Sequence, residues 1–245
     1  MTVRNIRFRQ SVIRTVLGLA AVSGLAMQPV ESAFAKVVEV SMTAVETKLV
    51  IDGEGHTYDA WTFNGQFPGP VIRVQEGDEV VFSLTNPETN GRPHSMDFHA
   101  AETNFLEHYK EVRPGESLQY RFKAKWPGIF AYHCGASPMI QHIARGMMGA
   151  IIVDPKDPKA LPKADREYVL VQSELFKDPD DVDGMFDRKY QHVVFNGSVF
   201  RYDPVHSKAG GDFLDAKPGE RVRFYFVNAG PNNVSAVHPI AEIWD

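Results

Sequence analysis

Two stretches of this chain repeat the same order of residues. Phe-Asn-Gly at 63–65 recurs at 195–197, and the segment 76–86 recurs at 218–228 with its glycine, its alternate apolar positions 80, 82 and 84 and its final asparagine in register. Self-similarity of this kind is typical of duplicated structural units. The repeat therefore predicts two domains of one fold, and chance similarity between β-turn residues is the alternative.

The residues between these landmarks have a β pattern. Short runs rich in Val, Ile, Phe and Tyr alternate with Gly, Pro, Asn and Asp, and outside the first residues only 101–108 could form a short helical turn. The runs lie at 37–42, 71–74, 79–85, 117–122, 129–133 and 150–153. Many short strands with frequent turn residues indicate an all-β chain built from sandwiches.

The repeat also predicts where the domains begin and end. Residues 156–166 are polar and rich in proline, so we expect a linker there, between a first domain at 36–155 and a second at 167–245. Each copy then reaches a histidine, His94 in the first and His238 in the second. The first copy continues for more than fifty residues after His94, whereas only seven residues follow His238. We therefore expect the second domain to be incomplete. Either the sequence is a fragment or the missing strands come from elsewhere, and we favour a fragment because an open half-sandwich would expose unpaired strand edges.

The first 35 residues differ from the rest. Four arginines precede the apolar run 16–27, and Ala33 and Ala35 offer small residues around a cleavage site. This is the pattern of a secretory signal peptide, because the apolar run is shorter than the roughly 20 residues of a spanning helix. We expect export to the periplasm and no later membrane span; a retained anchor or amphipathic tail is the alternative.

Charge excludes one class of partner. The 26 basic and 31 acidic residues give a net charge of −5, and no long run of lysine or arginine is present. A chain without a basic field has no general attraction for polyphosphate. Nucleic acid is therefore not expected as a partner.

Cys134 is the single cysteine of the chain. Exported proteins normally use cysteines in disulfides, but this thiol has no partner within the sequence. A lone thiol in an oxidising compartment is open to oxidation unless another group is bound to it. A bound metal is the simplest occupant.

The residues near Cys134 point to the same conclusion. His94 lies well upstream, and Cys134, His142 and Met147 follow one another around one short segment. Two imidazoles, a thiolate and a weak thioether are the ligands of a blue-copper electron-transfer site. Any one of these residues alone would more often be a buried core residue or a surface histidine. Together, in this order, they predict a mononuclear copper site.

Two further histidines could form a second site. His133 precedes Cys134, and neighbouring residues of a strand point to opposite faces of a sheet. His99 is separated from His94 by an odd number of positions, so it also changes face if the strand is regular. We expect His99 and His133 to meet on the far face as ligands of a second metal, although ordinary surface or core histidines are the alternative. A catalytic metal needs a third protein ligand from elsewhere.

At this point the sequence resembles a known family. The segments 94–99, 132–149 and 230–238, with the Phe-Asn-Gly turns, are similar to the copper-containing, nitric-oxide-forming nitrite reductases of the multicopper oxidase superfamily. The resemblance runs from about residue 40 to the end. The short loop from Cys134 to His142 resembles the subgroup that includes neisserial outer-membrane enzymes. The implied fold is two cupredoxin-like Greek-key β-sandwich domains, the second incomplete.

The resemblance implies a role for each site residue. His94, Cys134, His142 and Met147 correspond to the type 1 copper ligands, and His99 and His133 to two type 2 copper ligands. In the family the third type 2 histidine comes from a neighbouring subunit of a homotrimer, and it lies beyond the point where this sequence stops. The implied catalytic and substrate-pocket residues are Asp97, His238 and Ile240.

The resemblance also implies the reaction and its partners. The expected activity is reduction of nitrite to nitric oxide, with the electron entering at type 1 copper and passing through Cys134–His133 to type 2 copper. Asp97 would hydrogen-bond the substrate, His238 would share a water with it, and Ile240 would shape the pocket. The expected electron donor is a small cupredoxin or cytochrome c. Pro239 replaces the apolar residue that usually follows this histidine in the family.

Two other functions compete with this one. A laccase-like oxidase needs paired His-X-His motifs and a His-Cys-His segment, but Gly135 follows Cys134 here. That departure argues against oxygen reduction. An electron-transfer or copper-binding module that uses the type 1 site alone stays open as the alternative.

Overall fold

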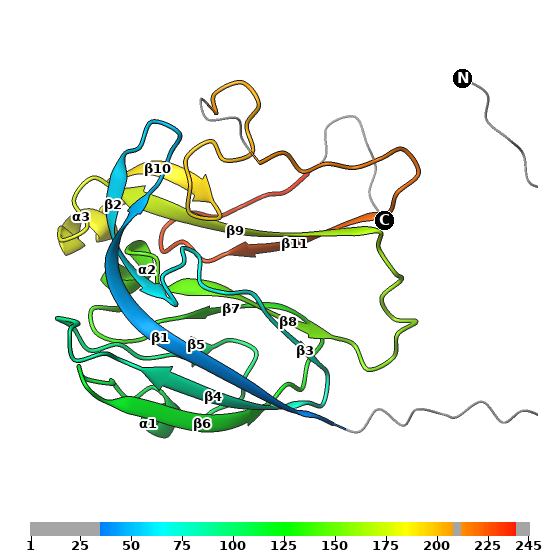
Figure 1. Cartoon of the computed structure of the whole chain (residues 1–245), viewed down its shortest axis with the longest axis horizontal. Helices are drawn as coiled ribbons and strands as arrows, with labels where there is room; N and C mark the ends of the chain where they lie inside the picture. Colours follow the sequence, from blue (N-terminus) through cyan, green and yellow to red (C-terminus); the bar gives the residue numbers. More distant parts are fainter. Residues whose placement is uncertain (1–34, 208–211, 239–245) are drawn as a thin grey trace, which may run out of the picture. The chain divides into compact units, whose positions relative to one another are not determined.

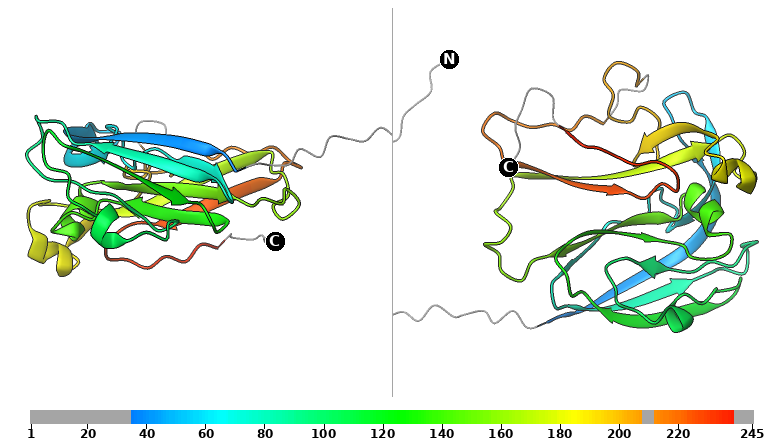
Figure 2. Two further views of the ribbon diagram at one scale, coloured as in Figure 1. Left: turned by 90° about the horizontal axis from the view of Figure 1, so that it is seen from below. Right: turned by 180° about the vertical axis from the view of Figure 1, so that it is seen from behind.

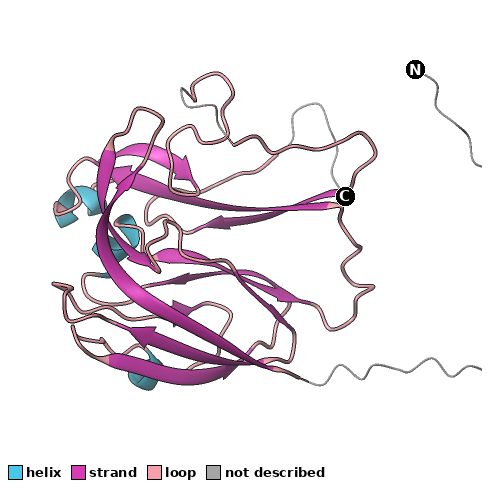
Figure 3. Ribbon diagram, viewed as in Figure 1, coloured by secondary structure: helices cyan, strands magenta, loops and turns pink. Residues whose placement is uncertain are grey.

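The computed structural model describes residues 35–207 and 212–238, and these residues form three β-sheets with three short helices (Figures 1 and 3). One four-stranded sheet has the order β2-β1-β4-β6 and the other β3-β8-β7-β5. Their strands are β1 (Val37–Val50), β2 (Thr57–Phe63), β3 (Ile72–Gln75), β4 (Glu79–Thr85), β5 (Asp97–Phe98), β6 (Ser117–Lys123), β7 (Gly128–His133) and β8 (Met148–Asp154). The third sheet, β10-β9-β11, consists of β9 (Arg166–Phe176), β10 (Tyr190–Phe195) and β11 (Val222–Asn228).

The two four-stranded sheets enclose one apolar core. Alternate residues of each strand point into it, including Phe82 of β4, Phe98 of β5 and Tyr132 of β7, which are all buried. Cys134 and Met147 belong to the same core. The predicted all-β sandwich is confirmed, since strands predominate and helices are short.

The third sheet repeats part of the first. β1 pairs with β4 in parallel and with β2 antiparallel, and β9 pairs in the same way with β11 and β10. At the Phe-Asn-Gly turns, Asn64 and Asn196 both have positive φ, and each side-chain oxygen accepts a hydrogen bond from the neighbouring strand, from the N–H of Thr43 and of Val171. The repeated residues thus adopt repeated structure.

One face of the third sheet packs on the sandwich (Figure 2). Met148 and Ala150 of β8 contact Val171 of β9 and Val227 of β11 in one apolar cluster. Ile151 and Val153 of β8 point the other way, into the sandwich core. Because both faces of β8 are covered, its sequence is a continuous apolar run and does not alternate.

Ion pairs add to this contact. Arg73 of β3 binds Asp154 of β8, with Nε 2.6 Å from Oδ2, and also Glu167 of β9. Residues 155–165 between the sheets form no helix or strand, as the proline-rich composition of the predicted linker indicates. Within the described residues, no helix is both long and apolar enough to cross a bilayer.

The sequence pattern missed the helices, apart from α1 (Phe105–His108) inside the expected turn at 101–108. The other two are α2 (Met139–Ala144) and α3 (Val182–Phe186). Each is too short to show a helical period, and α2 has four buried residues among its six. Tertiary packing therefore stabilises α2 more than its own sequence does. The predicted signal peptide lies almost wholly outside the described residues.

Gly149 in β8 offers a test of this packing. A Cβ atom there would lie 2.3 Å from Oη and 2.4 Å from Cζ of buried Tyr132, whose hydroxyl donates to the Pro70 carbonyl. Gly149→Ala should lower the free energy of unfolding by about 1–3 kcal/mol, because the core must move to accept the methyl group. Urea unfolding measures this change.

Gly91→Ala is the matched control, since its Cβ would make an ordinary 3.5 Å contact with Glu46. It should change the unfolding free energy by less than about 0.5 kcal/mol. Equal destabilisation by the two substitutions would contradict the packing described here.

Candidate metal centres

Three predicted ligand side chains meet in the core of the sandwich. His94 precedes β5, Cys134 follows β7, and His142 lies in α2. His142 Nδ1 is 3.2 Å from both His94 Nδ1 and Cys134 Sγ, and all three residues are buried. Met147, the fourth predicted ligand, is fully buried in the connection from α2 to β8. The structure thus brings together residues that lie far apart in the sequence.

Backbone hydrogen bonds hold this group. The Cys134 N–H donates to the Met147 carbonyl over 2.9 Å, and the Met147 N–H donates to the His142 carbonyl over 3.0 Å. The Ser95 N–H donates to Cys134 Sγ over 3.2 Å. An N–H aimed at sulfur stabilises a thiolate more than a thiol. The three chain segments therefore hold the thiol and imidazoles before any metal binds.

Burial decides the protonation of the group without metal. It lowers the pKa of His142 to about 3, with the nearby His94 adding to the effect, and it also lowers the pKa of His94 against the opposing influence of Glu46. Burial raises the pKa of Cys134 to about 11. Both imidazoles are therefore neutral and can donate electron pairs at neutral pH. A metal must displace the thiol proton when it binds.

Hydrogen bonds outside the group select the nitrogen atoms that face inward. His94 Nε2 lies 3.3 Å from Glu46 Oε1, so Nε2–H donates to the carboxylate and Nδ1 keeps its lone pair. Glu46 is held in turn by the N–H groups of Gly91 and Arg92, each at 3.0 Å. A carboxylate behind a metal-binding histidine is a common supporting contact. Two inward nitrogens and a sulfur fit a copper ion.

An aromatic and cationic layer covers this group. The Trp61 ring lies 4.7 Å from the His142 ring and 5.8 Å from the His94 ring, between centroids. The Arg145 guanidinium sits 4.5 Å from the Trp61 centroid and donates to the carbonyls of Asp59 and Pro179. These groups exclude water from the imidazoles. The sequence pattern alone did not single out Trp61 or Arg145.

The second predicted pair also meets. His99 Nε2 and His133 Nε2 are 3.0 Å apart, and Asp97 Oδ2 lies 3.6 Å from His133 Nε2 and 3.8 Å from His99 Nε2. Asp97 is directly opposite His133 in the β5–β7 ladder, whereas the next pair, Phe98 and Tyr132, points into the core. The carboxylate and the two imidazoles therefore lie on the face opposite to Cys134.

A backbone contact of His133 determines which of its ring nitrogens can bind a metal ion. Its Nδ1 lies 3.0 Å from the Cys134 carbonyl, which can only accept, so Nδ1 carries the hydrogen and Nε2 faces His99 with a lone pair. Burial lowers the pKa of His133. Cys134 and His133 thus face two separate groups while sharing one peptide bond.

Two further predicted residues are His238 and Ile240. His238 lies in the exposed stretch 234–238, and the group of ligand atoms within 4.8 Å of one another at Asp97 consists of Asp97, His99 and His133. Ile240 falls outside the described residues. Asp52, Glu54 and His56 form a further cluster at the β1–β2 turn, where they are partly or fully exposed. The sequence pattern predicts no role for that cluster.

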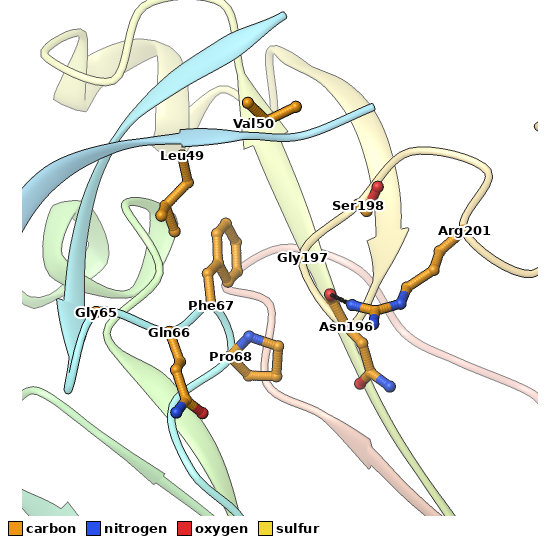
Figure 4. A pocket seen from close by; sticks show the side chains of 10 residues that line it. All are labelled: Leu49, Val50, Gly65, Gln66, Phe67, Pro68, Asn196, Gly197, Ser198 and Arg201. Atoms are coloured by element: carbon orange, nitrogen blue, oxygen red, sulfur yellow. Dashed lines mark hydrogen bonds between the residues drawn. The ribbon is translucent and has the colours of Figure 1, made fainter. Parts of the chain in front are cut away.

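A separate pocket of about 360 Å³ lies between the repeated turns (Figure 4). Gly65 and Phe67 line it from one side and Asn196 and Gly197 from the other, and Arg201 donates to the Asn196 carbonyl over 2.9 Å. None of the predicted site residues that the structure describes lines this pocket. The predicted metal-binding histidines lie in the two groups described above.

The buried thiol can be tested before any metal is added. Native, metal-free protein should react with a thiol reagent at pH 8 at least ~100-fold more slowly than urea-unfolded protein, because a pKa near 11 leaves very little thiolate. Cys134 is the sole cysteine, so labelling reports this site alone. Similar rates in native and unfolded protein would rule out the buried, protonated state.

Comparisons with known proteins identify the family. The multicopper oxidase family model matches residues 44–158. Copper-containing nitrite reductases from Neisseria gonorrhoeae and Alcaligenes xylosoxydans are 40% and 36% identical to this chain, covering 85% and 84% of it and 53% and 67% of their own lengths. The chain thus spans about half the length of the first curated relatives.

Solved structures agree. The copper nitrite reductase from Nitrosomonas europaea is 59% identical with a TM-score of 0.83, covering 85% of this chain and 73% of that one. A multicopper oxidase structure is 28% identical with a TM-score of 0.68, covering 80% of this chain and 64% of that one. The fold is cupredoxin-like, and the chain belongs to the family of copper-containing nitrite reductases.

Proposed function

We propose that the protein containing this chain reduces nitrite to nitric oxide with copper. The observation that carries the proposal is the placement of two groups of potential metal ligands on opposite faces of the sheet at β7. One group contains Cys134 and the other His133, and the peptide bond between these two residues joins them. The family relationship supports the same reaction. A laccase-like activity is not favoured by these relatives.

We assign the first group to type 1 copper, with His94, Cys134, His142 and Met147 as ligands. Thiolate, imidazole and thioether donors suit both copper oxidation states, and the buried site limits reorganisation. We assign His99 and His133 to type 2 copper, with a third histidine from a neighbouring subunit of a homotrimer. Bound copper supplies the one-electron redox chemistry. The Cys134–His133 unit provides the covalent path between the two sites.

The proposed reaction consumes one electron and two protons for each nitrite, and it releases nitric oxide and water. Asp97 lies beside both type 2 imidazoles, so its carboxyl group can hydrogen-bond nitrite and deliver a proton to a nitrite oxygen. We propose that His238 shares a water with Asp97 and that Ile240 shapes the substrate pocket, as the family resemblance implies. Because Asp97 lies beside the two imidazoles, the proton that it delivers to nitrite travels only a short distance.

The remaining parts of the proposal concern the whole protein. Residues 1–35 would direct export to the periplasm as a cleaved signal peptide, and a small cupredoxin or cytochrome c would supply electrons. The division into 36–155, linker 156–166 and 167–245 follows the repeat and the exposed connection between β8 and β9.

A type 1 electron-transfer module is the second candidate. Its supporting observation is that the whole proposed type 1 ligand set, His94, Cys134, His142 and Met147, is buried within this one chain. Electron paramagnetic resonance of the copper-loaded protein separates the two candidates. A type 1 signal without a type 2 signal would favour the module.

Ligand substitutions should separate the two copper signals. Cys134→Ser should abolish the intense visible absorption and the type 1 signal, because a hydroxyl cannot replace the thiolate. His99→Ala should remove the type 2 signal and leave the visible absorption unchanged. His192→Ala, an exposed histidine on β10, is the control and should alter neither signal. Loss of both signals in His99→Ala would argue against two independent sites.

Asp97→Asn should lower kcat for nitrite reduction by about 100-fold or more, because an amide cannot supply the proton that a carboxyl group can. The type 1 absorption should stay unchanged. Steady-state nitric oxide production with a fixed artificial electron donor measures the effect. Activity within about twofold of the unmodified protein would exclude Asp97 as the proton donor.

A further inference from the structure

We propose that Tyr109 is a positioning residue that holds the Asp97 carboxylate in the orientation needed for nitrite, an inference that rests on the proposed function. The Tyr109 hydroxyl donates a hydrogen bond to Asp97 Oδ1. The other carboxylate oxygen, Oδ2, is the one nearest to His99 and His133. The two oxygens of Asp97 therefore have different surroundings, and the one nearer the imidazoles stays available to substrate.

The ring of Tyr109 packs against Gly135, in the loop that follows the proposed type 1 ligand Cys134. A Cβ atom on Gly135 would lie 3.3 Å from Tyr109 Cδ1 and 3.2 Å from Ser95 Oγ, so the glycine makes room for the ring. Gly135 directly follows Cys134, and its N–H donates to Ser95 Oγ over 2.9 Å. Tyr109 thus contacts the Cys134 loop with its ring and Asp97 with its hydroxyl.

The segment that follows Tyr109 is held by hydrogen bonds to two other parts of the chain. Val112 exchanges two hydrogen bonds with His94, at 2.7 and 3.0 Å, and is buried in the core. Glu111 accepts a hydrogen bond from the Ser137 N–H over 3.1 Å. The segment is therefore held both to His94 and to the loop that follows Cys134, two parts of the chain that carry proposed type 1 ligands. A side chain anchored in this way can fix a neighbouring carboxylate, because little rotational freedom is left to it.

The phenol is suited to be a permanent donor. Burial and the adjacent Asp97 both raise the pKa of Tyr109 above its ordinary value, so the hydroxyl keeps its hydrogen. Hydrogen bonds from a neutral donor to a charged acceptor are stronger than those between neutral groups. Without this bond the carboxylate could rotate about its side-chain torsions and leave the imidazoles.

The experiment replaces Tyr109 by Phe in the full-length, copper-loaded protein, which keeps the ring on Gly135 and removes the hydroxyl. We expect a fall in kcat of about tenfold, the effect of losing a hydrogen bond to a charged group. The type 1 absorption and the copper content should not change. Nitrite titration of the type 2 paramagnetic signal should show weaker binding, a readout that does not depend on turnover.

Two comparisons distinguish positioning from a general structural effect. In an Asp97→Asn background, Tyr109→Phe should change kcat by less than about twofold, because a residue that acts through Asp97 has no further effect once Asp97 is altered. Tyr190→Phe is the matched control, since its half-buried hydroxyl also donates to a side-chain oxygen, on Asn233. It should leave kcat and nitrite binding unchanged.

A crystal structure of the Tyr109→Phe protein tests the inference even if the unmodified protein does not reduce nitrite. A displaced or rotated Asp97 carboxylate supports positioning, and in an inactive protein it would show that only the proposed function fails. An Asp97 carboxylate that keeps its orientation would overturn the inference. Additive effects of Asp97→Asn and Tyr109→Phe on kcat would overturn it as well.

Discussion

The alternation of side chains along β7 is the constraint on which both sites depend. This strand is hydrogen-bonded to β5 on one side and β8 on the other, so its residues cannot rotate between faces. Tyr132 points into the core and His133 points away, and Cys134 returns to the core as the strand ends. One peptide unit therefore reaches two chemical groups, and their separation is set by backbone geometry.

Burial then determines the chemistry of the inner group. Removing water makes charged imidazole and thiolate unfavourable, which is why the pKa of His142 falls and that of Cys134 rises. The protein compensates with a carboxylate behind His94 and an N–H aimed at the sulfur. In the proposed type 1 site a metal cation would complete this arrangement, since it would supply the positive charge that the buried thiolate needs.

The repeated half of the chain supports the first sandwich. β9 and β11 cover the outer face of β8, so that β8 packs between two apolar layers. The same strand follows Met147 directly and carries Gly149 against Tyr132. Packing of the third sheet is therefore transmitted to the segment that holds a proposed ligand, although no residue of that sheet belongs to either histidine group.

The sequence by itself determined the features that depend on local order. The repeat predicted matching turns, and the period-two alternation of a strand predicted that His133 and Cys134 would face opposite ways, as they do. Only the tertiary structure decided which distant residues surround these groups. Glu46 behind His94, Trp61 beside His142 and Tyr109 on Asp97 come from other segments of the chain. Sheet pairing and core packing set such contacts, and neither leaves a periodic signal in the sequence around the residues concerned.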